Sequence, residues 1–150
     1  MSIETRNASK TTEKIAGALL EAQKSIKKLV ANKENKFYNS SYVDLHACIE
    51  ACQEALNDNN IVIVQGFDHD GENDVFYVTT TLIHTSGQSL SNKVGFPIVK
   101  KDPQSIGQLC TYGRRYGLTA LCCLSEKDDD ANSTADYPLT NDLNDDDDDI

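Results

Sequence analysis

The chain has no tryptophan, only three prolines and no hydrophobic run of the roughly 18 residues that a membrane span requires. Its first residues lack the basic and apolar regions of a secretion signal, so the sequence predicts a cytoplasmic protein with no membrane partner. At 150 residues, of which 39% are hydrophobic, the chain suits one domain, or one domain with a tail, that can bury a core.

Catalytic and nucleotide-binding motifs are missing as well. The sequence contains no glycine-rich phosphate loop ending in Gly-Lys-Ser/Thr, no His-Glu-x-x-His pair, no Gly-x-Ser-x-Gly and no dinucleotide-binding glycine pattern. The three histidines are scattered, with no nucleophile pattern near them. These absences favour a binding protein over an enzyme, and we expect no cofactor.

Potential metal ligands are present in patterns that do not suit a metal. The five cysteines are an odd number without a secretion signal, which argues against a disulfide framework. Cys48 and Cys52 share one face of an expected helix without a second zinc-ligand pair, so we interpret them as small core residues. The acidic segment 68–74 has its glycine at the fourth position, not the sixth of a calcium loop, so we expect a solvated turn.

Charge is unevenly distributed along the chain. Residues 1–36 carry eight basic and four acidic residues, 37–92 carry eight acidic and no basic residues, and 93–125 carry five basic residues and one acid. Residues 126–150 hold eleven acids and one lysine, which accounts for the formal net charge of −10. We therefore expect a nearly neutral domain over 1–126 and a disordered acidic tail over 127–150. The low pI does not exclude nucleic acid as a ligand.

Hydrophobic spacing predicts an α+β fold. Apolar residues recur at helical spacing in two N-terminal segments, and β-branched and aromatic residues dominate the next three, which are joined by Gly-containing turns. A final helical segment opens with Asp102-Pro103, a favoured helix start. The expected elements are helices over 12–31 and 43–56, a loop over 32–41 between them, an antiparallel meander of strands over 61–65, 75–84 and 89–96, and a helix over 103–121.

The last of these helices has two contrasting faces. The apolar face consists of Ile106, Leu109, Cys110, Gly113, Gly117 and Ala120. Two glycines would cost about 1 kcal/mol each in helix propensity relative to alanine, so we expect compensation from close packing on the sheet. The opposite stripe consists of Gln104, Gln108, Thr111 and Arg115, flanked by Tyr112 and Arg114. Such donors suit phosphate oxygens and base edges, and an ordinary solvated helix face has the same pattern.

Three parts of the sequence resemble one known family. The segment 111–116, Thr-Tyr-Gly-Arg-Arg-Tyr, follows Pro103-Gln104 and precedes an acidic stretch. Together with the segments 37–45 and 79–87, it is similar to the Erf (essential recombination function) family of phage-type single-strand annealing proteins. The resemblance covers about residues 12–130.

The resemblance implies a β-β-β-α core and ATP-independent binding and annealing of single-stranded DNA during recombination in a bacterial host cell. It also implies rings or helical filaments of this chain, with the annealed duplex as an intermediate. The acidic tail could in addition dock to a host partner, such as a single-strand binding protein or a nuclease. Cations would neutralise phosphates and tyrosines would stack on bases, with Tyr116 the weakest candidate. The expected DNA-binding residues are Tyr42, Lys93, Lys100, Lys101, Gln104, Gln108, Thr111, Tyr112, Arg114 and Arg115.

Three other functions stay open at this point. The protein could protect single strands without annealing them, with its acidic tail recruiting partners. It could be a structural or regulatory oligomer whose Arg-Arg helix contacts a neighbouring subunit. A nuclease that uses the acids of 68–74 is the remaining alternative.

Overall fold

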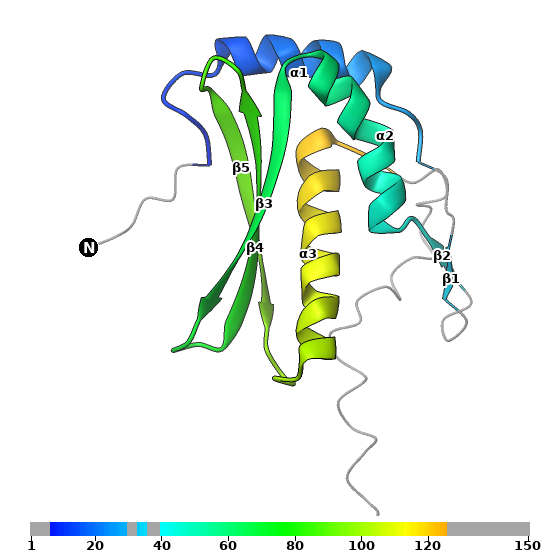
Figure 1. The fold of residues 1–150 in the computed structure, drawn as a ribbon, viewed down its shortest axis with the longest axis vertical. Helices are drawn as coiled ribbons and strands as arrows, with labels where there is room; N and C mark the ends of the chain where they lie inside the picture. The colour runs from blue at the N-terminus through cyan, green and yellow to red at the C-terminus, as the bar shows by residue number, and fades with distance from the viewer. Residues whose placement is uncertain (1–6, 30–32, 36–39, 126–150) are drawn as a thin grey trace, which may run out of the picture.

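The computed structural model describes residues 7–29, 33–35 and 40–125 (Figure 1). The predicted acidic tail and the domain boundary after residue 126 lie outside the described residues. So does half of the predicted loop over 32–41, including Phe37 and Tyr38.

The elements in chain order are α1 (Glu13–Ser25), β1 (Lys33–Asn35), β2 (Ser40–Tyr42), α2 (Leu45–Asp58), β3 (Ile61–Asp70), β4 (Val75–His84), β5 (Ser89–Pro97) and α3 (Pro103–Cys122). The last three strands form an antiparallel sheet in the order β3-β4-β5, and β1 pairs with β2 separately. Helices α2 and α3 cover one face of the larger sheet, and α1 lies across one end (Figure 1). The predicted α+β fold, a meander followed by a long helix packed on it, is confirmed.

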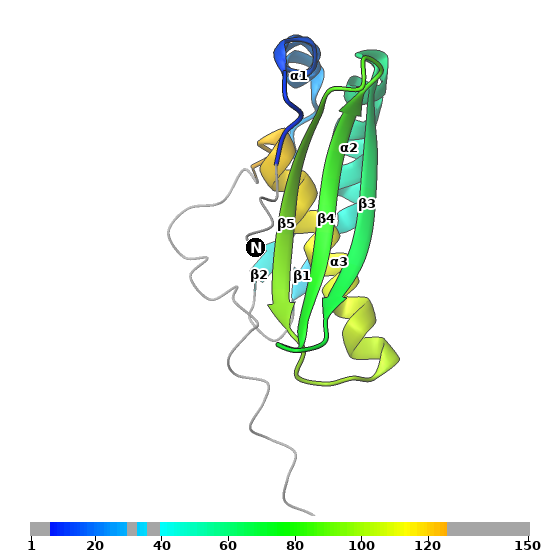
Figure 2. The ribbon, with the colours of Figure 1, turned by 90° about the vertical axis from the view of Figure 1, so that its left-hand side faces the viewer.

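The core lies between the larger sheet and the helices. Alternate residues of β4, namely Phe76, Val78, Thr80 and Leu82, are buried under the helices, because successive strand residues point to opposite faces. Helical residues complete the core: Ile15, Ala22, Cys48, Cys52, Leu56, Leu118 and Cys122. Cys48 and Cys52 are therefore core residues, as predicted. Among the described residues, no helix covers the other face of the sheet (Figure 2).

Polar side chains fix the start of each helix. The Asp44 carboxylate accepts a hydrogen bond from the Ala47 amide at 2.9 Å at the start of α2. Asp102 does the same for α3, accepting from the Ser105 amide at 2.9 Å, and Pro103 follows it as predicted. The start of α1 is held from a distance, since Oε1 of the buried Gln88 accepts from the amides of Lys14 and Ile15.

The first helix is shorter than its hydrophobic pattern predicts. It ends at Ser25 rather than near residue 31, because Ile26 adopts an extended conformation with ψ of 130°. The next amide, that of Lys27, donates to the Ala51 carbonyl of α2 at 3.1 Å. Ile26 and Leu29 still reach the core from this extended segment, so their helical spacing was misleading.

Two strand predictions also need correction. The predicted loop over 32–41 contains β1 and the first two residues of β2, which pair as a short hairpin, and these polar residues carry no strand signal. The third strand extends to Asp70 rather than Gln65. It pairs with β4 along its whole length despite Gly66 and three polar residues, which shortens the predicted acidic turn to residues 71–74.

The buried face of α3 is displaced from the predicted one. Gly113 and Gly117 are buried as predicted, but Ala120 is exposed and Leu118 is fully buried. The cause is that α3 packs against α2 as well as the sheet, which turns the buried arc toward Leu118.

Candidate nucleic-acid interface

Two glycines place α3 directly on the sheet. A methyl group at Gly113 would collide with Val78 of β4, and one at Gly117 would collide with Thr80. The Asn92 side chain of β5 donates to the Gly117 carbonyl at 3.0 Å. The predicted close packing is confirmed, and it fixes which side of α3 is turned away from the sheet.

Arg115 lies within a group of three tyrosines on this outward side. Its guanidinium carbon is 5.0 Å from the ring centroid of Tyr42, 5.4 Å from that of Tyr112 and 5.3 Å from that of Tyr116. Its Nη1 donates to the Val43 carbonyl at 3.0 Å, which ties α3 to the start of α2. We call Arg115 with these tyrosines the tyrosine cluster. The tyrosine rings are half-buried or exposed, so they present aromatic surface beside a fixed cation.

Arg114 points to a different part of the molecule. Its Nε donates to Oε1 of Gln65 on β3 at 3.0 Å, and Nε2 of the same glutamine donates to the Arg114 carbonyl at 2.9 Å. Gln65 Nε2 also donates to the buried Thr80 hydroxyl at 2.9 Å. The two neighbouring arginines therefore lie on different sides of α3, Arg115 toward β2 and the start of α2 and Arg114 toward β3.

The other predicted residues of α3 form an exposed stripe. Gln104, Gln108 and Thr111 are all exposed, and the stripe leads along the helix to the tyrosine cluster. Lys100 and Lys101 are exposed just before α3 begins. Lys101 lies 2.9 Å from a carboxylate oxygen of Asp74, and this hydrogen bond lowers the pKa of Asp74 below its ordinary value.

Lys93 does not join this surface. It pairs in register with Thr79 on the sheet face opposite the helices. There its ammonium lies 4.2 Å from the centroid of the Tyr77 ring and 3.8 Å from Asp68. The structure thus places nine of the ten predicted residues on or beside α3, with Arg114 turned toward β3 and away from the other eight, and it places Lys93 on the opposite sheet face.

Sequence reasoning missed two parts of the site. Gln65 stands in a β-branched strand segment as an isolated amide, and that polar residue among apolar ones was the available signal. The Val43 carbonyl, a backbone group, leaves no signal in a side-chain pattern. Tyr116 was the weakest stacking candidate, yet it belongs to the tyrosine cluster and its ring centroid lies 6.1 Å from that of Tyr112.

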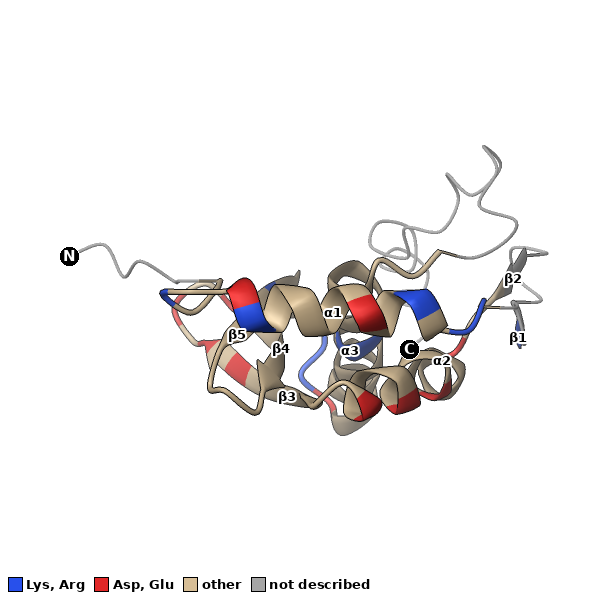
Figure 3. Cartoon of the chain, turned by 90° about the horizontal axis from the view of Figure 1, so that it is seen from above, with Lys and Arg blue, Asp and Glu red and all other residues tan. Residues whose placement is uncertain are grey.

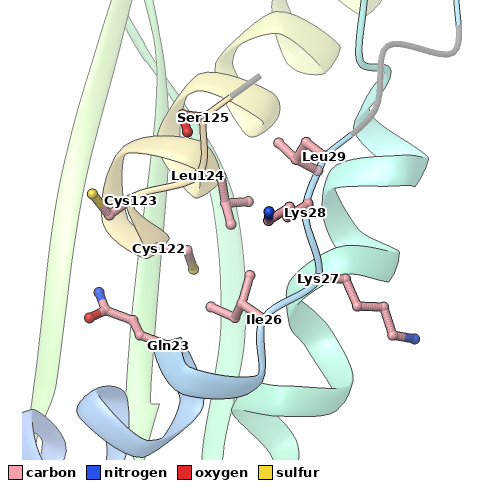
Figure 4. Close-up of a pocket in the computed structure, with 9 residues that line it drawn as sticks. All are labelled: Gln23, Ile26, Lys27, Lys28, Leu29, Cys122, Cys123, Leu124 and Ser125. Atoms are coloured by element: carbon pink, nitrogen blue, oxygen red, sulfur yellow. The ribbon is translucent and has the colours of Figure 1, made fainter. Parts of the chain in front are cut away.

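A pocket of about 330 Å³ lies at the far end of α3 from Gln104. Figure 4 shows Ile26 and Leu124 approaching each other from its two sides, with the Lys28 ammonium beside Leu124 and Cys123 directed away. The Cys122 thiol, which lines the pocket, donates a hydrogen bond to the Cys52 sulfur, and this bond and burial raise the pKa of Cys122, so the thiol stays protonated. We assign the pocket no binding role.

No cluster of three or more metal-ligating side chains occurs within residues 7–29, 33–35 and 40–125. Over the same ranges, no helix is long and apolar enough to cross a membrane.

A family model described as the ERF superfamily matches residues 15–143. The chain belongs to the ERF superfamily. The matched range covers α1 from Ile15 onward, the described elements from β1 to α3, and the tyrosine cluster, so the resemblance based on residues 37–45, 79–87 and 111–116 is confirmed. Membership associates the chain with phage-type recombination by single-strand annealing. Searches of curated proteins and of solved structures gave no match for this ERF superfamily member.

Proposed function

We propose that this protein binds single-stranded DNA and anneals complementary strands without ATP. The observation that carries the proposal is the tyrosine cluster, in which a tethered arginine lies among three partly exposed aromatic rings on the outward side of α3. Such a combination of a cation and π-faces suits a strand whose phosphates need neutralising and whose bases need a stacking surface.

The exposed stripe gives the strand a path to the cluster. Gln104 and Arg115 are eleven residues apart on one helix, which corresponds to about 16 Å along its axis. At a phosphate spacing of about 3.4 Å per strand, that length accommodates four or five nucleotides. The amides of Gln104 and Gln108 and the hydroxyl of Thr111 can donate to phosphates or base edges. Lys100 and Lys101 add positive charge at the end of the stripe beside Gln104.

Annealing adds a requirement that simple binding does not have. The held strand must keep its base edges accessible to a second strand, while its phosphates are screened enough for the two strands to approach. The stripe lies on the exposed outside of α3, which leaves a bound strand open to solvent and to its complement. ERF superfamily membership supports annealing over protection alone.

The test mixes two complementary oligonucleotides, labelled as a fluorescence donor and acceptor, with the full chain in the absence of nucleotide triphosphate. We expect duplex formation to be much faster than without protein. Binding without acceleration would indicate a protective single-strand binding protein. The absence of both DNA binding and faster annealing would overturn the proposal in favour of a structural oligomer. Cleaved strands would indicate a nuclease.

A pair of variants localises the activity. Tyr112→Ala removes one ring of the tyrosine cluster, and we expect it to weaken DNA binding and slow annealing. Tyr77→Ala removes a tyrosine from the opposite sheet face, where its ring contacts Lys93, and serves as the matched control. Equal loss in both variants would separate the activity from the cluster.

A further inference from the structure

The second half of β3 is left open on the side that faces the helices. α3 packs mainly on β4 and β5, and α2 packs over the beginning of β3. Alternate residues of β3 point toward the helices, and they become more exposed along the strand. Ile61 is fully buried, Ile63 and Gln65 are half-buried, and Phe67 is exposed. Figure 1 shows β3 and β4 curving away from α3 toward their connecting turn, which explains the opening.

Phe67 is an unusual residue for this open position. Its side chain is 54% exposed, although phenylalanine is mainly a core residue. One side of its ring contacts Phe76, with the ring centroids 5.7 Å apart, so the ring is supported by the core and leaves its other side open. An exposed aromatic ring anchored in this way is suited to receive another flat ring.

Gln65 connects this ring to a cation. Gln65 and Phe67 lie two residues apart on β3, so their side chains share one face of the strand, about 7 Å apart. Gln65 holds Arg114 through Nε, which leaves the two terminal guanidinium nitrogens without a hydrogen-bond partner among the described residues. The Arg114 main chain is fixed too, because its carbonyl accepts from the same glutamine.

We infer that Phe67 and Arg114 form a second nucleotide subsite, in which the Phe67 ring stacks on an unpaired base and the terminal nitrogens of Arg114 bind the adjoining phosphate. Gln65 is the positioning residue that sets the direction of the guanidinium. The subsite lies on the β3 side of α3, whereas the tyrosine cluster lies on the side of β2 and α2. The inference rests on the proposed binding of single-stranded DNA, and it adds a base contact that the α3 stripe does not contain.

The absence of tryptophan from the chain allows a direct test. Phe67→Trp keeps an aromatic ring at an exposed position and introduces the sole tryptophan, so its fluorescence reports on that site alone. The probe is a short single-stranded oligonucleotide of mixed sequence, with binding followed independently by fluorescence anisotropy of a dye on the DNA. We expect strong quenching of the introduced tryptophan, and the quenching should saturate together with the anisotropy signal.

Val64→Trp is the matched control. Val64 lies on the same strand but on its opposite face, and it is 46% exposed, similar to Phe67. We expect little quenching of this tryptophan. An oligomer of abasic deoxyribose phosphate should bind Phe67→Trp through phosphates and leave its fluorescence nearly unchanged.

A second variant measures what the ring contributes. Phe67→Leu keeps apolar contact with Phe76 but has no π-face, and we expect about 5-fold or greater loss of affinity, as for removal of one base–aromatic stack. If Phe67→Trp binds DNA with wild-type affinity and its tryptophan is not quenched, the subsite is overturned and the proposed function stands. If the wild-type chain binds no single-stranded DNA, both fall together.

Discussion

Arg114 and Arg115 are adjacent in sequence, but the fold gives their side chains different contacts. Arg115 is held by a backbone carbonyl and three tyrosine rings, whereas Arg114 is held by one glutamine from β3. Helical geometry predicted that both would lie away from the glycine face. It could not show which neighbours they meet, because Val43 and Gln65 are distant in sequence and carry no local pattern.

Asp102 gives a prediction about pH at the residue scale. The Ser105 hydroxyl and amide donate to its carboxylate, which holds the pKa of Asp102 below its ordinary value. A lowered pKa in the folded state stabilises the protein above the ordinary aspartate pKa of about 3.9, and this stabilisation is lost as the pH falls through the lowered value. We expect Asp102→Ala to reduce the free energy of unfolding at neutral pH.

The same variant should differ progressively less from wild type in acid. Urea unfolding of both proteins, from about pH 7 down to about pH 3, measures this convergence. Asp102→Asn retains an oxygen acceptor for the Ser105 amide and is the control that separates the cap from the charge. A difference between wild type and Asp102→Ala that stays constant over this range would contradict the assignment.

At the scale of elements, hydrophobic periodicity predicted the amphipathic helices and strands. It failed for elements whose presence or end is determined by tertiary contacts. The meander and α3 have the predicted order, because alternation and helical spacing both follow burial against one layer. The end of α1 and the β1–β2 hairpin depend on contacts with α2 and on strand pairing, so the local sequence did not reveal them. The buried arc of α3 was displaced for the same reason.

Glycines of α3 provide the sharpest test of its packing. Helix propensity alone predicts that any Gly→Ala change stabilises α3 by about 1 kcal/mol. We expect this at Gly107, where an added methyl group meets no atom within 4 Å. At Gly113 and Gly117 the methyl group would collide with the sheet, so we expect each substitution to destabilise the protein by about 1–3 kcal/mol. Thermal or urea unfolding of the three variants measures the sign, and stabilisation at all three would disprove the close contact.

At the scale of the whole molecule, one helix carries charge of a single sign. Exposed acids follow one another along α2, whereas α1 carries two acids and two lysines and is followed by exposed Lys27 and Lys28 (Figure 3). The uncovered sheet face adds exposed Val62, Val64 and Ile83. A molecule with complementary and apolar surfaces in different places can associate head to tail, which produces a closed ring or an open helix.

We therefore predict an assembly of many copies built from one repeated interface. Multi-angle light scattering at micromolar concentration, with and without single-stranded DNA, measures the mass. Electron micrographs of the same samples distinguish a ring from a filament. A monomer under both conditions would contradict this prediction.

The acidic C-terminal sequence leads to another prediction at this scale. Residues 145–149 are five consecutive aspartates, and a tether to the domain gives them roughly millimolar effective concentration. We expect them to compete with DNA for the cations beside and on α3, so truncation after Asp130 should tighten DNA binding at low salt. The gain should fade as salt screens both competitors. Equal affinities at low salt would leave docking to a host protein, or solubility, as the role of the tail.

The central claim is that single-stranded DNA binds to α3 through Arg115 in the tyrosine cluster and through Arg114 on the β3 side. The salt dependence of binding tests this claim most directly. The variant replaces Arg114 and Arg115 by alanine, and its control replaces Lys14 and Lys24, two exposed lysines of α1. Urea unfolding first establishes that both variants fold. We predict that the slope of log affinity against log salt becomes shallower by about 1.4 in the arginine variant, because each lost phosphate contact changes it by about 0.7, and stays unchanged in the control. An unchanged slope in a folded arginine variant would contradict the account.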